Sequence, residues 1–184
     1  MNLAVFISGG GSNLKALIDA ETNGYFESQI KIIVANKDAP GLRHARDNNI
    51  DYLISKDEDE IIEVLKKYDI DLIVLAGYLV RISKKLLDNF TVINIHPSLL
   101  PKYGGKGFYG IHVHQAVFAN KEKISGVTVH YVNENLDDGD VILQKEVDIS
   151  NCKSPEEIAS EVLKVEHQTL KKVIKKLEDE ECAH

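Results

Sequence analysis

The sequence predicts an α/β fold built on an open, mostly parallel sheet of about seven strands, with helices on both faces. Short apolar segments alternate with segments in which apolar residues recur at helical spacing. The apolar segments of the first half are unbroken, which is typical of strands buried on both faces. In the C-terminal half, two longer β-rich segments are separated only by a short acidic loop, which predicts an antiparallel element.

The elements of the first half follow this alternation in order. A strand at 2–7 precedes a helix at 12–21, in which Leu14, Leu17 and Ile18 share one face. A helix at 57–69 begins with acidic residues and ends with lysines, as the helix dipole favours. The remaining strands are expected at 30–36, 51–55, 71–77 and 91–96, and the remaining helices at 41–49 and 83–90. This order of elements is typical of a Rossmann-like sheet.

After Pro101 the pattern changes. The segment at 102–110 has four glycines in nine residues and no hydrophobic period, so we expect a flexible loop that closes over the site when ligands bind. A helix is expected at 111–120, followed by strands at 124–134 and 140–149.

One long helix is expected to end the chain. It runs from Ser154 to about Glu180, with Ser154 as the capping residue and Pro155 at the first helical position. Its lysines are expected to face solvent. Its buried stripe is expected to comprise Ile158, Val162, Val165, Leu170, Val173, Ile174 and Leu177.

Length and charge narrow the class of protein. A chain of 184 residues favours a single domain over 1–184. The net charge of −7 argues against a nucleic-acid partner, which usually needs a basic surface. The sequence has no basic leader and no apolar run long enough to cross a membrane. Cys152 and Cys182 give no disulfide framework, so a reducing compartment, the cytoplasm, is expected.

The first predicted strand ends in the glycine-rich stretch "SGGGSN". Ligands bind at the carboxyl ends of strands in such sheets, and a helix N-terminus attracts anions. We therefore expect Gly11, Ser12 and Asn13 to hold a single phosphate. A triphosphate loop would need Gly-Lys-Ser/Thr, and a dinucleotide site would need a third glycine and an acidic end to the second strand, which instead ends in Asn36-Lys37. A plain glycine turn with Ser12 as helix cap remains the alternative.

The stretch "INIHP" ends the strand at 91–96. Asn94 and His96 share one strand face, and Pro97 restricts His96 to an extended backbone. An amide N–H and a protonated imidazole that converge on one point form an oxyanion site. Asp137, in "NLDDGDVI", would favour the imidazolium if it lay close to His96. The alternative is a buried core histidine with an unrelated Asp-Asp-Gly turn.

Three further histidines, His112, His114 and His130, raise the question of a metal. No cysteine or carboxylate completes a tetrahedral set with them, so we expect site lining or structural roles and no metal.

Four stretches together resemble the glycinamide ribonucleotide (phosphoribosylglycinamide) formyltransferases, a family of folate-dependent enzymes of purine synthesis. They are "FISGGGSNLKALIDA", "VLAGYLVRIS", "INIHPSLLPKY" and "SGVTVHYVNENLDDGDVILQ", and they cover nearly the whole chain in order. The resemblance implies transfer of a formyl group from 10-formyltetrahydrofolate, as co-substrate, to the primary amine of 5′-phosphoribosylglycinamide. The products are formylglycinamide ribonucleotide and tetrahydrofolate.

The resemblance also implies roles for particular residues. It assigns catalysis to Asn94, His96 and Asp137, and the ribonucleotide to Gly11, Ser12 and Asn13 at the phosphate and Glu166 at the glycinamide end. It divides the domain into a phosphate-binding half at 1–100 and a half with the folate site and last helix at 101–184. The folate-binding residues that it implies are Leu79, Val80, Arg81, Ile82, Asn94, Asn133, Glu134, Asn135, Leu136 and Asp137.

Other function classes make different demands on the sequence. A nucleotide-dependent oxidoreductase would need the missing glycine and acidic residue, and a non-catalytic binding module would not need Asn94, His96 and Asp137 together. A tRNA formyltransferase would need a basic C-terminal domain, and a formyltetrahydrofolate hydrolase usually has an extra N-terminal domain. The sequence leaves a monomer and a homodimer equally open.

Overall fold

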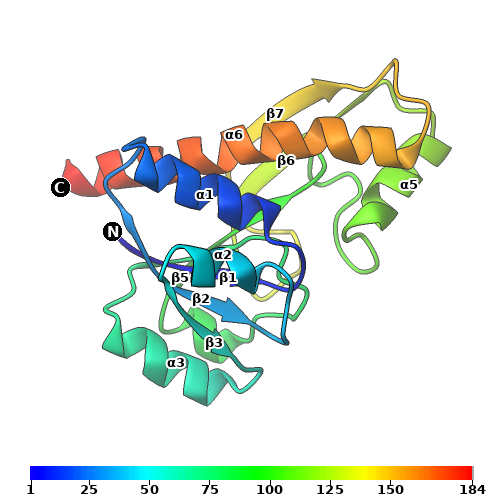
Figure 1. The fold of residues 1–184 in the computed structure, drawn as a ribbon. Helices are drawn as coiled ribbons and strands as arrows, with labels where there is room; N and C mark the ends of the chain where they lie inside the picture. The colour runs from blue at the N-terminus through cyan, green and yellow to red at the C-terminus, as the bar shows by residue number, and fades with distance from the viewer. Residues whose placement is uncertain (184) are drawn as a thin grey trace.

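A computed structural model describes residues 1–183 and contains one seven-stranded sheet with the order β3-β2-β1-β4-β5-β6-β7 (Figure 1). The first five strands pair in parallel, whereas β6 runs antiparallel to β5 and β7 antiparallel to β6. The predicted fold class is therefore confirmed. The strands are β1 Asn2–Ile7, β2 Gln29–Ala35, β3 Asp51–Ile54, β4 Leu72–Leu75, β5 Thr91–His96, β6 Ile124–Tyr131 and β7 Val141–Asp148.

The helices begin and end close to the predicted positions. Ser154 caps the last helix and accepts the N–H of Glu157, and Asp57 caps the helix at Glu58–Lys67. The helices are α1 Ser12–Thr22, α2 Leu42–Asp47, α3 Glu58–Lys67, α4 Lys84–Leu87, α5 Ile111–Ala119 and α6 Pro155–Cys182. None of the helices within residues 1–183 is both long enough and apolar enough to cross a bilayer.

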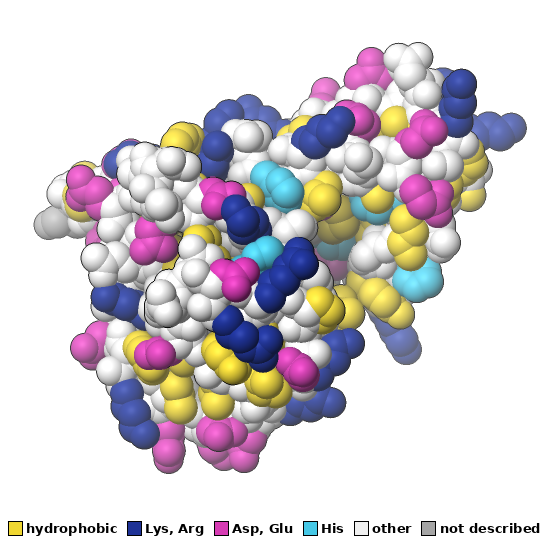
Figure 2. Space-filling model, viewed as in Figure 1, with side chains coloured by type: hydrophobic (Ala, Val, Ile, Leu, Met, Phe, Trp, Pro, Cys, Tyr) yellow, Lys and Arg dark blue, Asp and Glu magenta, His cyan; other side chains and the backbone are white. Residues whose placement is uncertain are grey.

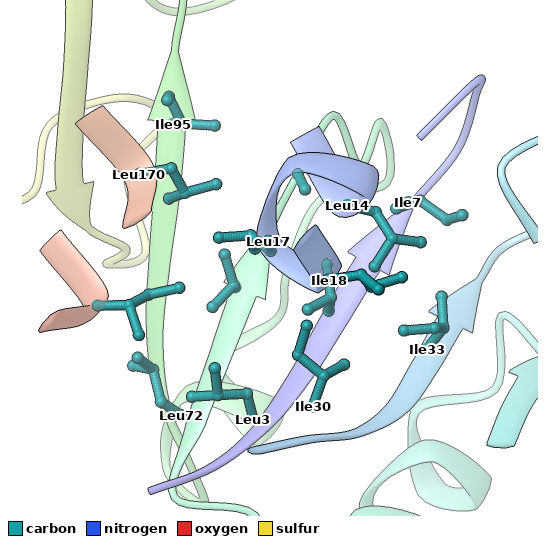
Figure 3. Close-up of a cluster of buried hydrophobic side chains, with 14 of the residues drawn as sticks. Leu3, Ile7, Leu14, Leu17, Ile18, Ile30, Ile33, Leu72, Ile95 and Leu170 are labelled. Atoms are coloured by element: carbon teal, nitrogen blue, oxygen red, sulfur yellow. The ribbon is translucent and has the colours of Figure 1, made fainter. Parts of the chain in front are cut away.

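Helices cover both faces of the sheet. On one face α1, α2 and α6 cover an apolar cluster that includes residues of β1, and α1 and α6 lie side by side (Figure 1). Figure 3 shows Leu14, Leu17 and Ile18 of α1 directed toward the strands. On the other face α3 and α4 cover a second apolar cluster. Successive residues of β1 enter opposite clusters, which explains why its apolar run is unbroken.

The topology brings the predicted site segments to one edge of the sheet. The chain order reverses beside β1, because β2 and β3 lie on one side of it and β4 and β5 on the other. This switch point is where open α/β sheets bind ligands. The Ser8 hydroxyl, at the end of β1, accepts the N–H of Leu79, which follows β4. The two loops at the switch point are therefore tied together.

The structure corrects several predicted boundaries. The strand expected at 71–77 contains only Leu72–Leu75. The strand β6 ends at Tyr131 rather than at residue 134, and residues 132–137 leave the sheet. The loop closes back on the strand, where the N–H of Tyr131 donates to the Asp140 carbonyl. Gly139 is required at this point, because a Cβ would collide with the Tyr131 carbonyl. The short helix α4 contains only Lys84–Leu87, rather than the whole of 83–90.

Candidate active site

A cavity of about 570 Å³ opens at the carboxyl ends of β4 and β5. It is lined by 77–82, 94–97, 105–110 and 132–137, together with Leu75 and His130. Figure 2 shows histidine side chains around a hollow in the drawn face of the molecule. All of the residues to which the sequence resemblance assigned folate lie in this lining: Leu79, Val80, Arg81, Ile82, Asn94, Asn133, Glu134, Asn135, Leu136 and Asp137.

Two loops form the outer rim of the cavity. The Arg81 guanidinium donates to the Glu134 carbonyl at 2.7 Å, and the Lys84 ammonium lies 3.4 Å from the Glu134 carboxylate. Leu79 and Leu136 are 59% and 50% exposed, although both are large apolar residues. Exposed apolar side chains at the rim of a cavity of this size are typical of a small-molecule site.

The side chains of Asn94, His96 and Asp137 all line the cavity. We call them the catalytic cluster, after the role that the sequence resemblance predicts for them. The His96 Nδ1 lies 3.6 Å from the Asp137 Oδ2. Asn94 and His96 end β5, whereas Asp137 comes from the loop after β6 and has a left-handed backbone with φ of 54°. Aspartate tolerates this conformation better than most residues do. The antiparallel return of β6 therefore joins residues that are far apart in sequence.

His96 is buried, and both of its ring nitrogens face oxygen atoms. Its Nε2 donates to the Tyr103 carbonyl at 2.7 Å, and its Nδ1 faces the Asp137 carboxylate. These two neighbours fix the orientation of the imidazole ring.

His130 is the nearest neighbour of this cluster, and the sequence reasoning gave it only a lining or structural role. Its Nε2 lies 3.2 Å from the Asn94 Nδ2 and 3.7 Å from the Asp137 Oδ1. Burial lowers the pKa of His130, although the Tyr131 carbonyl and Asp137 oppose this shift. The Nδ1–H donates to the Tyr131 carbonyl, so the Nε2 of the neutral ring accepts from Asn94 and orients that amide. The signal that would reveal this is the strand register, which pairs Asn94 with His130.

The other two histidines differ from each other. His114 is buried near His96, and its pKa falls to about 4 through burial and, secondarily, the charge of His96. His112 lies on the surface, where its ring meets Tyr109 edge-on and its Nδ1 lies 3.2 Å from Gln115. Residues 1–183 contain no group of three His, Cys, Asp or Glu side chains placed to hold a metal ion.

Residues 8–13 form a second cluster at the same edge, outside the lining of the large cavity. We call this segment the phosphate loop, after the ligand that the sequence predicts for it. Gly11 caps α1 with φ of 71°, so Ser12 is the first helical residue and not the cap. The helix has no side-chain cap and no acidic residue in its first turn, unlike α3 and α6. Its N-terminal N–H groups and dipole are therefore available to an anion.

Glu166 reaches this loop from α6. The Asn13 Nδ2 donates to the Glu166 Oε2 at 2.7 Å, and both side chains are buried. Burial raises the pKa of Glu166, and the hydrogen bond from Asn13 opposes that shift. The Asn13 Oδ1 is also buried and has no hydrogen-bond partner among the described residues. The Asn13 Oδ1 is therefore left for a further polar group.

The sequence pattern of the family described as formyl transferase matches residues 1–174. The chain belongs to the formyl transferase family. Among its relatives, phosphoribosylglycinamide formyltransferase of Escherichia coli K12 is 37% identical over 91% of this chain and 82% of that protein. The chloroplastic enzyme of Vigna unguiculata is 39% identical over 97% of this chain.

Solved structures of the family agree with this assignment. Glycinamide ribonucleotide transformylase 1 from Symbiobacterium toebii has a TM-score of 0.89 and 29% identity, and the match covers 97% of this chain and 88% of that one. The Geobacillus kaustophilus protein has a TM-score of 0.87 and 33% identity, over 96% and 97% of the two chains. The chain spans 61–63% of the length of the first curated relatives, which are plant proteins named chloroplastic.

Proposed function

We propose that the chain transfers a formyl group from 10-formyltetrahydrofolate to the primary amine of 5′-phosphoribosylglycinamide. The products are formylglycinamide ribonucleotide and tetrahydrofolate, in de novo purine synthesis. The observation behind this proposal is the meeting of Asn94, His96 and Asp137 in the 570 Å³ cavity beside an uncapped helix N-terminus. These residues match the chemistry of acyl transfer to an amine.

The reaction begins when the neutral amine of the glycinamide attacks the formyl carbon. A C–N bond forms, and the formyl oxygen takes the electron pair and becomes an oxyanion. The Asn94 amide and the Nδ1–H of the His96 imidazolium donate to this oxygen. The Tyr103 carbonyl holds the Nε2–H, whereas the Nδ1 lies 3.6 Å from Asp137, beyond hydrogen-bond distance, so its N–H is left for the oxyanion. Because both groups are held in place before the reaction, they stabilise the charge without reorganising.

The tetrahedral intermediate then collapses. The attacking nitrogen loses a proton toward Asp137, directly or through water, and the folate nitrogen gains a proton as its bond to the formyl carbon breaks. The Asp137 carboxylate therefore has two roles, because it also faces the His96 Nδ1 at 3.6 Å. No net proton is consumed when the products leave.

The two substrates occupy the two clusters. The large cavity has the size of a typical small-molecule site and holds the folate. Backbone groups of 79–82 and 133–137 form hydrogen bonds with the edges of its pterin ring. The N-terminus of α1, with Gly11, Ser12 and Asn13, holds the ribonucleotide phosphate. The Glu166 carboxylate binds the polar glycinamide end next to Asn13. The division into a phosphate half at 1–100 and a folate half at 101–184 is part of the same proposal.

We infer a cytoplasmic protein that acts on small molecules alone, without nucleic acid, membrane or metal, as a monomer or homodimer. Cys152 and Cys182 are both free thiols, which agrees with a reducing compartment. The plant relatives are named chloroplastic, so fractionation of cells that express this chain is the measurement that decides the compartment.

One assay tests the proposed function. Purified chain is mixed with both substrates, and the conversion of the folate is followed by its absorbance. We expect conversion that needs the amine substrate and is lost in the His96→Ala variant. Conversion at the same rate without the amine would instead indicate hydrolysis of the formyl group, and no conversion under either condition would contradict the proposal.

A further inference from the structure

The first residues of the glycine-rich loop touch both titratable members of the catalytic cluster. We call residues 103–105 the loop stem. The Tyr103 carbonyl accepts from the His96 Nε2 at 2.7 Å, and the Gly105 N–H donates to the Asp137 Oδ2 at 2.8 Å. Gly104 lies between them, and a Cβ there would collide with Leu100 and crowd Asp137. The backbone of the stem therefore helps to set where both catalytic side chains lie.

Tyr103 has a backbone conformation that a tyrosine adopts only when its surroundings impose it. Its φ is 55°, in the left-handed region that disfavours bulky side chains. The ring is fixed by packing: it meets Phe108 edge-on at 6.0 Å and lies against the apolar cluster beneath α5 and α6. The hydroxyl is fixed as well, because it donates to the Glu122 Oε1 at 2.9 Å.

Glu122 lies in the turn between α5 and β6, outside the cavity lining. Its carboxylate accepts from the Tyr103 hydroxyl and lies 3.4 Å from the Lys102 ammonium. The Tyr103 hydrogen bond, followed by Lys102, lowers the pKa of Glu122, so the group is a carboxylate near neutral pH. On the other side of the stem, the Ser98 hydroxyl donates to the Lys102 carbonyl at 2.6 Å and reaches the Tyr103 carbonyl at 3.5 Å.

We propose that Tyr103 and Glu122 are positioning residues for the reaction at His96. The Glu122 carboxylate holds the Tyr103 hydroxyl, which helps keep Tyr103 in its left-handed conformation. In that conformation the Tyr103 carbonyl fixes the His96 Nε2, and the His96 Nδ1 is directed toward Asp137. The proposal rests on the proposed function only in naming formyl transfer as the reaction.

Steady-state kinetics of four single variants test this chain of contacts. Tyr103→Phe removes only the hydroxyl, and Glu122→Ala removes its acceptor. We expect both to lower kcat by about 5–20-fold, the loss that one hydrogen bond typically causes, with the KM of either substrate changed less than about twofold. Glu122→Gln keeps an acceptor oxygen and should restore most of kcat. Lys102→Met is the matched control, because it removes the other partner of Glu122, and its kcat should stay near wild type.

The double variant Tyr103→Phe/Glu122→Ala should lose no more kcat than either single variant, because both remove the same contact. Losses that multiply would overturn the proposal. So would a Tyr103→Phe variant with wild-type kcat, or one whose only defect is a lower thermal unfolding midpoint.

A measurement without substrate separates this proposal from the proposed function. The ¹⁵N resonance of the His96 Nε2 should shift in Tyr103→Phe and Glu122→Ala and stay unchanged in Glu122→Gln and Lys102→Met. Resonances that are the same in all four variants would overturn the positioning role. A wild-type chain without formyl transfer would refute the proposed function alone, because the His96 resonance still reports on the stem.

Discussion

The chain uses glycine at its site in two physically different ways. In the phosphate loop, Gly11 has φ of 71°, and a Cβ on it would lie 2.9 Å from the Gly41 Cα, so the loop is packed tightly against the start of α2. In the glycine-rich loop, Gly105 and Gly107 have φ of 83° and 91°, yet a Cβ there would meet nothing within 4 Å. Gly11 therefore serves close packing, as Gly104 in the loop stem also does, whereas Gly105 and Gly107 serve backbone conformation alone.

We expect this difference to separate substrate binding, at the phosphate loop, from the chemical step, at the glycine-rich loop. A tightly packed loop with free N–H groups is formed before the ligand arrives, so changes there should affect ribonucleotide affinity. The glycine-rich loop has open space around it but is attached to His96 and Asp137 through its stem. Changes near that attachment should affect turnover. The predictions below test this division, beginning with the largest effect.

The catalytic cluster gives the largest expected effect. His96→Ala and Asn94→Ala each remove one donor to the oxyanion, which typically lowers kcat by about 10²–10³-fold. Both KM values should change much less. The double variant should lose less than the product of the two single losses, because the donors act on one oxygen. Steady-state kinetics provide the check, and a loss that appears only in KM would contradict the assignment.

The phosphate loop is best tested at Gly10. A Cβ at Gly10 meets nothing within 4 Å, whereas Gly11→Val would also strain the packing against Gly41. Gly10→Val should therefore obstruct the anion without disturbing the fold. We expect the ribonucleotide KM to rise by about 10–100-fold, the loss of one or two hydrogen bonds to a charged group. The folate KM is the internal control, and an equal rise in both would show that the loop has only a structural role.

Glu166→Gln should have a smaller effect, about tenfold on the ribonucleotide KM, because one charged hydrogen bond is weakened. Glu161 on the same helix is only half buried and pairs with Lys164, so Glu161→Gln is the matched control. Because burial raises the pKa of Glu166, wild-type affinity should fall on acidification at a higher pH than an ordinary carboxylate would cause. The ribonucleotide affinity of the Glu166→Gln variant should lack this pH dependence. A Glu166→Gln variant with wild-type kinetics would show that Glu166 does not bind the ribonucleotide.

The smallest effect is expected away from both loops, at Glu178. Burial alone would raise its pKa, but hydrogen bonds from Ser28, Glu27 and Lys175 lower it from 4.5 to about 2. The folded-state pKa is depressed, so its contribution to stability is present above pH 4.5 and is lost as the pH falls toward 2. Glu178→Gln should lower Tm by about 2–4 °C at pH 7. Calorimetry should show the difference in Tm between wild type and variant closing on acidification, while the kinetics at pH 7 stay unchanged. A difference that persists at low pH would contradict the assignment of this stability to the ionised Glu178 carboxylate.

Local patterns predicted the elements of this fold well. The unbroken run at 2–7 and the Ser154-Pro155 start of the last helix depend on burial and capping, which neighbouring residues determine. The sequence also predicted that Asn94 and His96 share a strand face. What it could not supply was the register between β5 and β6, on which the pairing of Asn94 with His130 depends. Contacts made by backbone atoms, such as the hydrogen bond from the His96 Nε2 to the Tyr103 carbonyl, cannot be predicted from the pattern of side chains.

Hydrogen exchange over the two glycine-rich segments tests the division between them most directly. We expect amides at 106–110 to exchange quickly in the free chain. Their exchange should slow when both substrates are bound, or when a folate analogue and a product analogue are bound together. The Gly41 amide, which donates to the Gly9 carbonyl of the phosphate loop, should be slow already in the free chain. The free amides at 12–13 should slow when the ribonucleotide alone is bound. Slow exchange at 106–110 in the free chain, unchanged by ligands, would contradict the account, because both segments would then be equally rigid.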